Sequence, residues 1–148
     1  MRKSLLLLPL LFGLLISGCA MFTSHYDATR HENFTKLKAM HIKLFDNWTV
    51  GSEMSWNETA VRQYCENGDL KFREAFEFAM SKDNTDKTGQ TAVKILWEEF
   101  SANCKLSLNK KKLFSSVYVE ETRPQIEQNY NYAIAGELSR VGSPSGGN

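Results

Sequence analysis

Apolar residues recur every three or four positions along most of the chain, which is the spacing of one face of an α-helix. The first such stretch begins after about residue 24 and reaches Trp48 without a glycine or proline. Its apolar stripe covers roughly 100° of the helical wheel, which is wide enough to face a globular core. The pattern therefore predicts a long amphipathic helix. The stripe is formed by Phe34, Leu37, His41, Leu44, Phe45 and Trp48.

Two more helices are expected after a turn at residues 49–53. Ser55 and Glu58 have the spacing of a capping box, in which two side chains satisfy free backbone groups at a helix start. Asn67 and Gly68 are residue types that often end a helix in the left-handed conformation, so we expect a short extra helix before them. The next helix should reach about residue 81, with an apolar face formed by Phe72, Ala75, Phe76, Ala79 and Met80.

The second half of the chain predicts another long helix and then an interrupted one. A polar loop at 82–89 precedes a helix that carries Trp97, Phe100 and Cys104 on one face. Beyond a polar turn at 107–112, the apolar stripes that contain Phe114 and Ile126 are about 120° out of phase on a single straight helix. Pro124 lies between them and disfavours helical geometry in the preceding residue. We therefore expect a kink or break at 122–124.

No strand pattern competes with these helices. Long helical stretches joined by short connections predict an all-α fold, an antiparallel bundle of four main helices plus the short extra helix. The bundle is expected to form one domain over residues 25–140. Residues 141–148 are rich in glycine, serine and proline, which predicts a disordered tail.

The start of the chain has a different composition from the rest. A basic pair precedes an apolar run, residues 5–16, that is short for a membrane span, and small residues follow it. The sequence Ile16-Ser17-Gly18-Cys19 resembles the lipobox of bacterial lipoproteins. The resemblance implies that residues 1–18 are a cleaved signal peptide and that Cys19 carries fatty acyl chains such as palmitate. An ordinary secretory signal or a helical anchor is the alternative.

The same resemblance implies a location. Ala20, and not an aspartate, follows Cys19, and in a cell with two membranes the family's sorting rule then implies the outer membrane, with the protein facing the periplasm. Each buried methylene of an acyl chain contributes about 0.8 kcal/mol, so several chains anchor the protein without a membrane-spanning helix. Residues 19–24 would form a tether between the lipid and the bundle.

The net charge of the chain bears on nucleic acid binding, and its cysteine content predicts a disulfide. The whole chain has a net charge of +1, and removal of Arg2 and Lys3 with the signal leaves −1, which does not suggest nucleic acid binding. Once Cys19 carries lipid, Cys65 and Cys104 are an even pair in an exported protein, which predicts a disulfide. Closing a loop of about 40 residues would contribute about 4 kcal/mol. Two free buried thiols are the alternative.

His41 is the strongest candidate for chemistry inside the bundle. It lies on the first apolar stripe, where a neutral imidazole can bind a ligand or cofactor. The alternative is a core histidine that is hydrogen-bonded to a side chain of another helix. No two histidines have the i, i+3 or i, i+4 spacing of a helical metal-ligand pair, and no nucleophile elbow or phosphate loop is present. The sequence therefore predicts no metal, no cofactor and no catalytic site.

Several apolar residues lie off the predicted stripes. Phe78 and Tyr132 point away from them and are candidates for binding a partner protein, as are Ile42 and Ile95. The alternative is a helix that is buried on two sides. The lysine run 110–112 suits either phosphate head groups or a solvated turn.

Together these observations predict a lipid-anchored, non-catalytic interaction or structural module for another envelope protein. A small-ligand or cofactor-binding bundle that uses His41 is the alternative hypothesis. A periplasmic enzyme with an unrecognised site is a weaker one.

Overall fold

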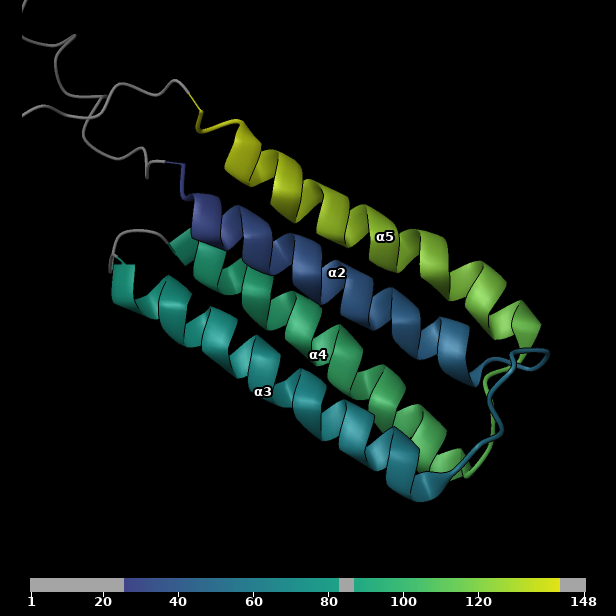
Figure 1. The fold of residues 1–148 in the computed structure, drawn as a ribbon. Helices are drawn as coiled ribbons and strands as arrows, with labels where there is room; N and C mark the ends of the chain where they lie inside the picture. The colour runs from purple at the N-terminus through teal and green to yellow at the C-terminus, as the bar shows by residue number, and fades with distance from the viewer. Residues whose placement is uncertain (1–25, 83–86, 142–148) are drawn as a thin grey trace, which may run out of the picture.

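The computed structural model describes residues 26–82 and 87–141. The helices in this part of the chain are α2 (Ala28–Trp48), α3 (Glu58–Lys82), α4 (Lys87–Lys110) and α5 (Ser116–Leu138). No strand forms in the described ranges apart from one isolated bridge between Thr49 and Phe114. The α2–α3 and α4–α5 connections lie together at one end of the molecule, and α2 begins and α5 ends at the other (Figure 1). The predicted all-α class is confirmed.

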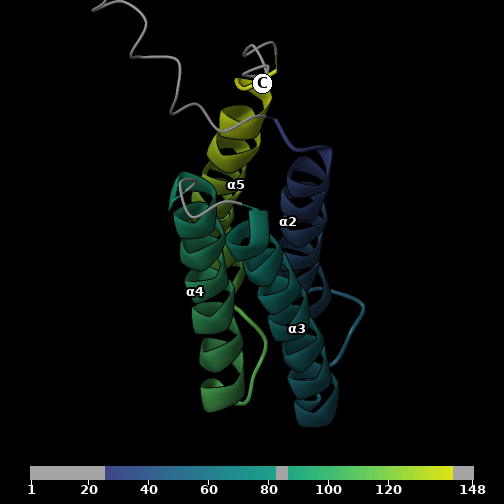
Figure 2. The same cartoon turned by 90° about the vertical axis from the view of Figure 1, so that its left-hand side faces the viewer.

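Each helix packs on two neighbours around one apolar core. α2 contacts α3 and α5, and α4 contacts the same two helices from the other side (Figure 2). α3 packs most extensively on α4 and α2 on α5, whereas α4 and α5 have the least contact of these four neighbouring pairs. The interior therefore consists of two tight helix pairs, and the α4–α5 side is the most open.

The first helix forms as its pattern predicts. All six residues of its predicted stripe are buried. The Asp27 side chain caps the helix, since Oδ1 accepts hydrogen bonds from the backbone N–H groups of Thr29 at 2.9 Å and Arg30 at 3.2 Å. The start of α2 is therefore fixed by the Asp27 cap.

The short extra helix is absent, because α3 is continuous from Glu58 to Lys82. Asn57, and not Ser55, caps the start of α3, since its side chain accepts a hydrogen bond of 2.9 Å from the N–H of Ala60. Gly68 lies inside the helix, where a Cβ atom would overlap the ring of Phe100. The glycine therefore permits close approach of α4 and does not end a helix, so the prediction of an extra helix is wrong.

The break expected near Pro124 is also absent, because α5 continues through it. Phe114 precedes the helix and Val117 is 61% exposed, so neither belongs to its buried face. The buried residues of α5 follow one another at spacings of seven, four and seven, so they lie on one face of a continuous helix. Pro124 lies on the exposed side, where water can hydrate the carbonyl group that loses its N–H partner. The buried positions are Val119, Ile126, Tyr130 and Glu137.

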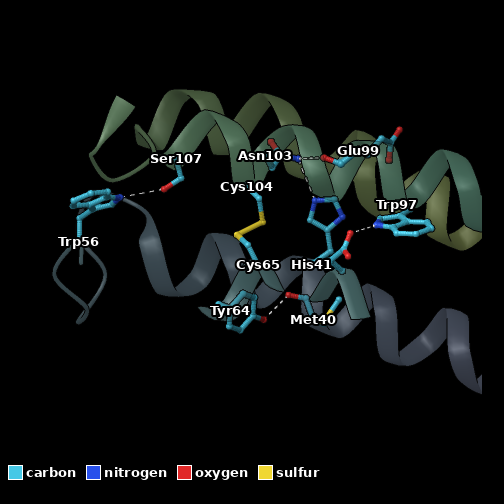
Figure 3. The surroundings of a disulfide bond; sticks show 11 residues. Met40, His41, Trp56, Tyr64, Cys65, Trp97, Glu99, Asn103, Cys104 and Ser107 are labelled. Carbon is cyan, nitrogen blue, oxygen red and sulfur yellow. Dashed lines mark hydrogen bonds between the residues drawn. A yellow bond between two sulfur atoms is a disulfide. The ribbon is translucent and has the colours of Figure 1, made fainter. Parts of the chain in front are cut away.

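The predicted disulfide is confirmed. Cys65 of α3 and Cys104 of α4 are bonded, with their Cα atoms 5.9 Å apart (Figure 3). Both residues are buried. The bond therefore joins the most extensively packed helix pair from the core side.

The expected signal peptide 1–18, Cys19, the tether 19–24 and residues 142–148 of the expected tail lie outside the described residues. None of the helices that the structure describes combines the length and the apolar composition needed to cross a bilayer.

Replacing Gly68 by alanine should lower the free energy of unfolding. Overlap with the buried Phe100 ring costs about 1–3 kcal/mol, which exceeds the gain of about 0.5–1 kcal/mol from removing a helical glycine. Gly136→Ala is the control, because a Cβ atom there meets nothing within 4 Å and should stabilise α5 slightly. Urea unfolding followed by circular dichroism measures both variants. Equal effects would show that Phe100 does not press on Gly68.

Candidate functional site

His41 lies at the centre of the bundle and is completely buried. α2 places its ring edge-on to Phe100 of α4 and Tyr130 of α5, with ring centroids 5.3 and 5.8 Å away. Phe45, one helical turn later, stacks on it at 5.8 Å. The imidazole therefore occupies a core position between three helices.

Both imidazole nitrogens have partners within the protein. Nδ1 lies 3.2 Å from the hydroxyl of Tyr130. Nε2 lies 3.1 Å from the amide nitrogen of Asn103, a contact that Figure 3 shows. The same amide nitrogen donates to the backbone oxygen of Glu99, and the amide oxygen accepts from the hydroxyl of Tyr118 at 2.6 Å. Because this arrangement orients the amide, Nε2 accepts and Nδ1 carries the proton that is donated to Tyr130.

This environment keeps His41 neutral. Burial lowers its pKa to about 4. Protonation would also place an N–H of Nε2 against the donor nitrogen of Asn103. A ligand role for His41 would require one of these two bonds to be given up, so the geometry favours the core-histidine interpretation.

A second polar group lies beside this network. Asn129 of α5 donates a hydrogen bond of 2.6 Å to Oε1 of Glu99, and Oε2 is buried without a hydrogen-bond partner in the described part of the chain. Burial raises the pKa of Glu99, and the bond from Asn129 opposes this shift. Burial, and then the charge of Glu99, also raises the pKa of Tyr130. These side chains join α4 to α5 across their looser contact.

A buried ion pair closes the end of the bundle where α2 begins. Arg30 and Glu137 are 3.3 Å apart, and their side chains are 5% and 2% exposed. Glu137 also accepts a hydrogen bond of 2.8 Å from the backbone N–H of Asp27 and lies 3.3 Å from Arg140. The carboxylate is therefore compensated by charge and by hydrogen bonding, as a buried charge requires.

An open apolar groove of about 290 Å³ runs between α4 and α5 near that same end. Tyr132 and Ile95 lie on its two sides and are 65% and 48% exposed. The Tyr132 hydroxyl accepts a hydrogen bond of 2.7 Å from Gln128, which holds the ring in place. The groove owes its width to small side chains between these two, at Ala92, Ala133 and Gly136.

The structure brings together only some of the predicted partner-binding residues. Tyr132 and Ile95 share the α4–α5 groove. Phe78 lies on α3, does not line that groove, and is half-buried. Ile42 is half-buried against the core. Of these four residues, Tyr132 and Ile95 are therefore the two that share one exposed apolar groove.

Within residues 26–82 and 87–141, no three histidine, cysteine, aspartate or glutamate side chains gather in a way that could hold a metal ion. The chain matches no protein-family model, no curated protein and no solved structure.

His41 should make stability depend on pH. The unfolded chain has the ordinary histidine pKa of about 6.5, whereas the folded state has about 4, so only the unfolded state takes up this proton between those values. Stability from this residue is complete above pH 6.5 or so and should fall by about 3 kcal/mol as the pH approaches 4. His41→Gln should be less stable at pH 7 but lose less stability on acidification.

Urea unfolding at several pH values between 7 and 4 measures this difference. The matched control is His31→Gln, which makes the same change at a half-buried histidine near the start of α2, away from the Tyr130 and Asn103 contacts. If His41→Gln had the acid dependence of the unaltered protein, the buried neutral imidazole would be excluded as its source.

Proposed function

We propose that this protein is a lipid-anchored bacterial envelope protein that binds another envelope protein, without catalysis, through the α4–α5 groove. The observation that carries the proposal is the exposure of Tyr132 and Ile95 on the two sides of one preformed apolar groove. Exposed apolar grooves of this kind are typical protein-binding surfaces.

The chemistry of the groove favours an apolar occupant. Glu137, the acidic residue in its lining, is already paired with Arg30 and Arg140. The exposed Lys94 and Glu98 lie 3.9 Å apart on α4 and offset each other. An occupant therefore meets apolar surface without an excess of either charge, and one apolar face of a partner helix fits this description. Tyr132, held by Gln128, is suited to be the aromatic anchor.

The lipobox supports the anchor. α2 begins at Ala28, soon after Cys19, so acyl chains on Cys19 would hold this end of the bundle near the membrane. The groove residues Glu137 and Arg140 lie at the same end. We place the protein at the outer membrane, facing the periplasm, because Ala20 follows the cysteine.

The polar interior supports a role without catalysis. The two nitrogens of His41 are occupied by Tyr130 and Asn103, and burial keeps the imidazole neutral. A general acid or base must reach its substrate, and His41 is completely buried. The interior is therefore better suited to holding the helices together.

We also infer that successive helices run in opposite directions. Arg30 near the start of α2 pairs with Glu137 near the end of α5, and Asp46 near the end of α2 pairs with Arg123 near the start of α5. Short connections favour the same arrangement. It leaves the groove and the α4–α5 connection at opposite ends of the bundle.

Replacing Cys19 by serine in the full chain should abolish lipid attachment, because only the thiol serves as the acceptor in a lipobox. We expect the precursor to accumulate unprocessed and labelled palmitate to be absent from it. Metabolic labelling and gel mobility measure both effects. Unchanged processing in the serine variant would point instead to an ordinary secretory signal.

In-cell photo-crosslinking tests the groove. A benzoylphenylalanine residue at Tyr132 or Ile95 should give a discrete crosslinked product with one envelope protein. Leu70 of α3 is the matched control, because it is similarly exposed but lies outside the groove. We expect no such product from Leu70.

A second substitution separates loss of binding from loss of folding. A Cβ atom at Gly136 meets nothing within 4 Å, so Gly136→Trp should fill the groove and leave the thermal stability nearly unchanged. We expect it to remove the crosslinks from Tyr132 and Ile95. Crosslinks that persist in a folded Gly136→Trp protein would exclude the groove as the binding surface.

A further inference from the structure

A second cavity of about 290 Å³ is lined by residues of the two connections, α2–α3 and α4–α5. These connections lie at the end of the bundle away from the start of α4 and the end of α5 (Figure 1). The end of α4, the start of α5 and the connection after α2 all contribute to it. Its lining combines apolar side chains with lysines and includes Val50, Lys110, Lys112, Leu113, Phe114 and Tyr118. The proposed groove lies at the start of α4 and the end of α5, so the two surfaces do not share a residue.

The apolar wall of this cavity is held rigidly. Phe114 donates a backbone hydrogen bond to Trp48 and accepts one from Val50, each 2.8 Å long. Its ring stacks on Tyr118 at 5.8 Å and meets Phe45 of the core edge-on at 5.2 Å. Val50 nevertheless exposes 60% of its surface beside this wall. The cavity is therefore preformed and carries an apolar side chain that the bundle itself does not cover.

The rim of the cavity is positively charged. Lys110, Lys111 and Lys112 are exposed, and within the residues that the structure describes none of them has an ion-pair partner. Lys111 has a φ of 50°, a left-handed conformation that ends α4 and reverses the chain. This turn puts Lys110 and Lys112 on the same cavity. α5 begins beside them with no acidic residue in its first turn, so its helix dipole adds to the positive potential.

We propose that this cavity binds a peptide segment of a partner protein in which carboxylates lie next to a bulky apolar side chain. The apolar side chain would cover Val50 and the Phe114–Tyr118 wall, and the carboxylates would accept charge-assisted hydrogen bonds from Lys110 and Lys112. A volume of about 290 Å³ is at the lower end of the range for ligand pockets, which suits one large side chain.

The mixed lining distinguishes this occupant from a membrane surface. Phosphate head groups would satisfy the lysines but leave the Val50 side of the cavity exposed to water. The cavity also lies at the far end of the bundle from the start of α2, whereas the proposed anchor precedes α2. The lysines would therefore point away from the membrane that holds Cys19, toward proteins of the surrounding compartment.

A labelled peptide tests the proposal. The probe is a fluorescein-labelled peptide of glycine and serine that carries one phenylalanine followed by two glutamates, titrated with the full chain in neutral detergent and followed by fluorescence anisotropy. Binding should weaken as salt is added, because exposed charges are screened. A peptide with glutamines for the glutamates, or with alanine for phenylalanine, should bind at least tenfold more weakly.

Protein variants locate the binding. The double variant Lys110→Gln/Lys112→Gln should weaken peptide binding at least tenfold, and Val50→Ser several-fold, since these side chains line the cavity and are exposed. Lys105→Gln is the matched control, an exposed lysine of the same helix outside the cavity, and should bind as the unaltered protein does. Circular dichroism checks that every variant is folded.

Three results would overturn the proposal. The first is peptide binding that is unchanged in the double lysine variant, and the second is equal binding of the peptide without phenylalanine. The third is no peptide binding together with lysine-dependent binding of phosphatidylglycerol vesicles, which would assign the rim to a lipid surface. None of these results bears on the proposed α4–α5 groove, because the groove is tested separately by crosslinking and by Gly136→Trp at the other end of the bundle.

Discussion

The bundle depends on satisfying the polar atoms that lie on its buried helix faces. A buried polar group without a partner costs free energy, and a buried charge costs more. His41 meets this constraint through Tyr130 and Asn103, and Glu137 meets it through Arg30 and the backbone at Asp27. These contacts join α2 to α4 and α5, so the same bonds that neutralise the interior also fix how the helices pack. A ligand or catalytic role inside would compete with them.

Local pattern predicted much of this fold, because the helices are amphipathic and the interior is apolar. The α2 stripe and the Cys65–Cys104 bond are found where the sequence placed them. The errors occurred where a tertiary contact decides the local structure. Gly68 has the residue type of a helix end, but it lies inside α3 because the Phe100 ring packs against it. Phe114 fits a helical pattern, but its backbone is hydrogen-bonded to Trp48 and Val50 at the other connection. Neither partner is close in sequence.

For the candidate sites too, the sequence predicted what a local pattern determines and missed what contacts between distant segments determine. Off-stripe position selected the exposed Tyr132 and Ile95 but also the half-buried Phe78, because the pattern of one helix does not reveal which neighbour covers it. The buried ion pair had a signal in the sequence that was missed, since both charged residues lie in phase with the apolar faces of α2 and α5. The lysine-rimmed cavity could not be predicted, because its walls come from three separate segments.

The neutral state of the His41 imidazole is the property on which this interior depends most. Nitrogen-detected NMR of the His41 imidazole measures its protonation state and its tautomer most directly. We expect His41 to be the Nδ1–H tautomer at pH 7 and to stay neutral to about pH 5, with a pKa of about 4. Titration near the ordinary histidine pKa, or an Nε2–H tautomer, would contradict it.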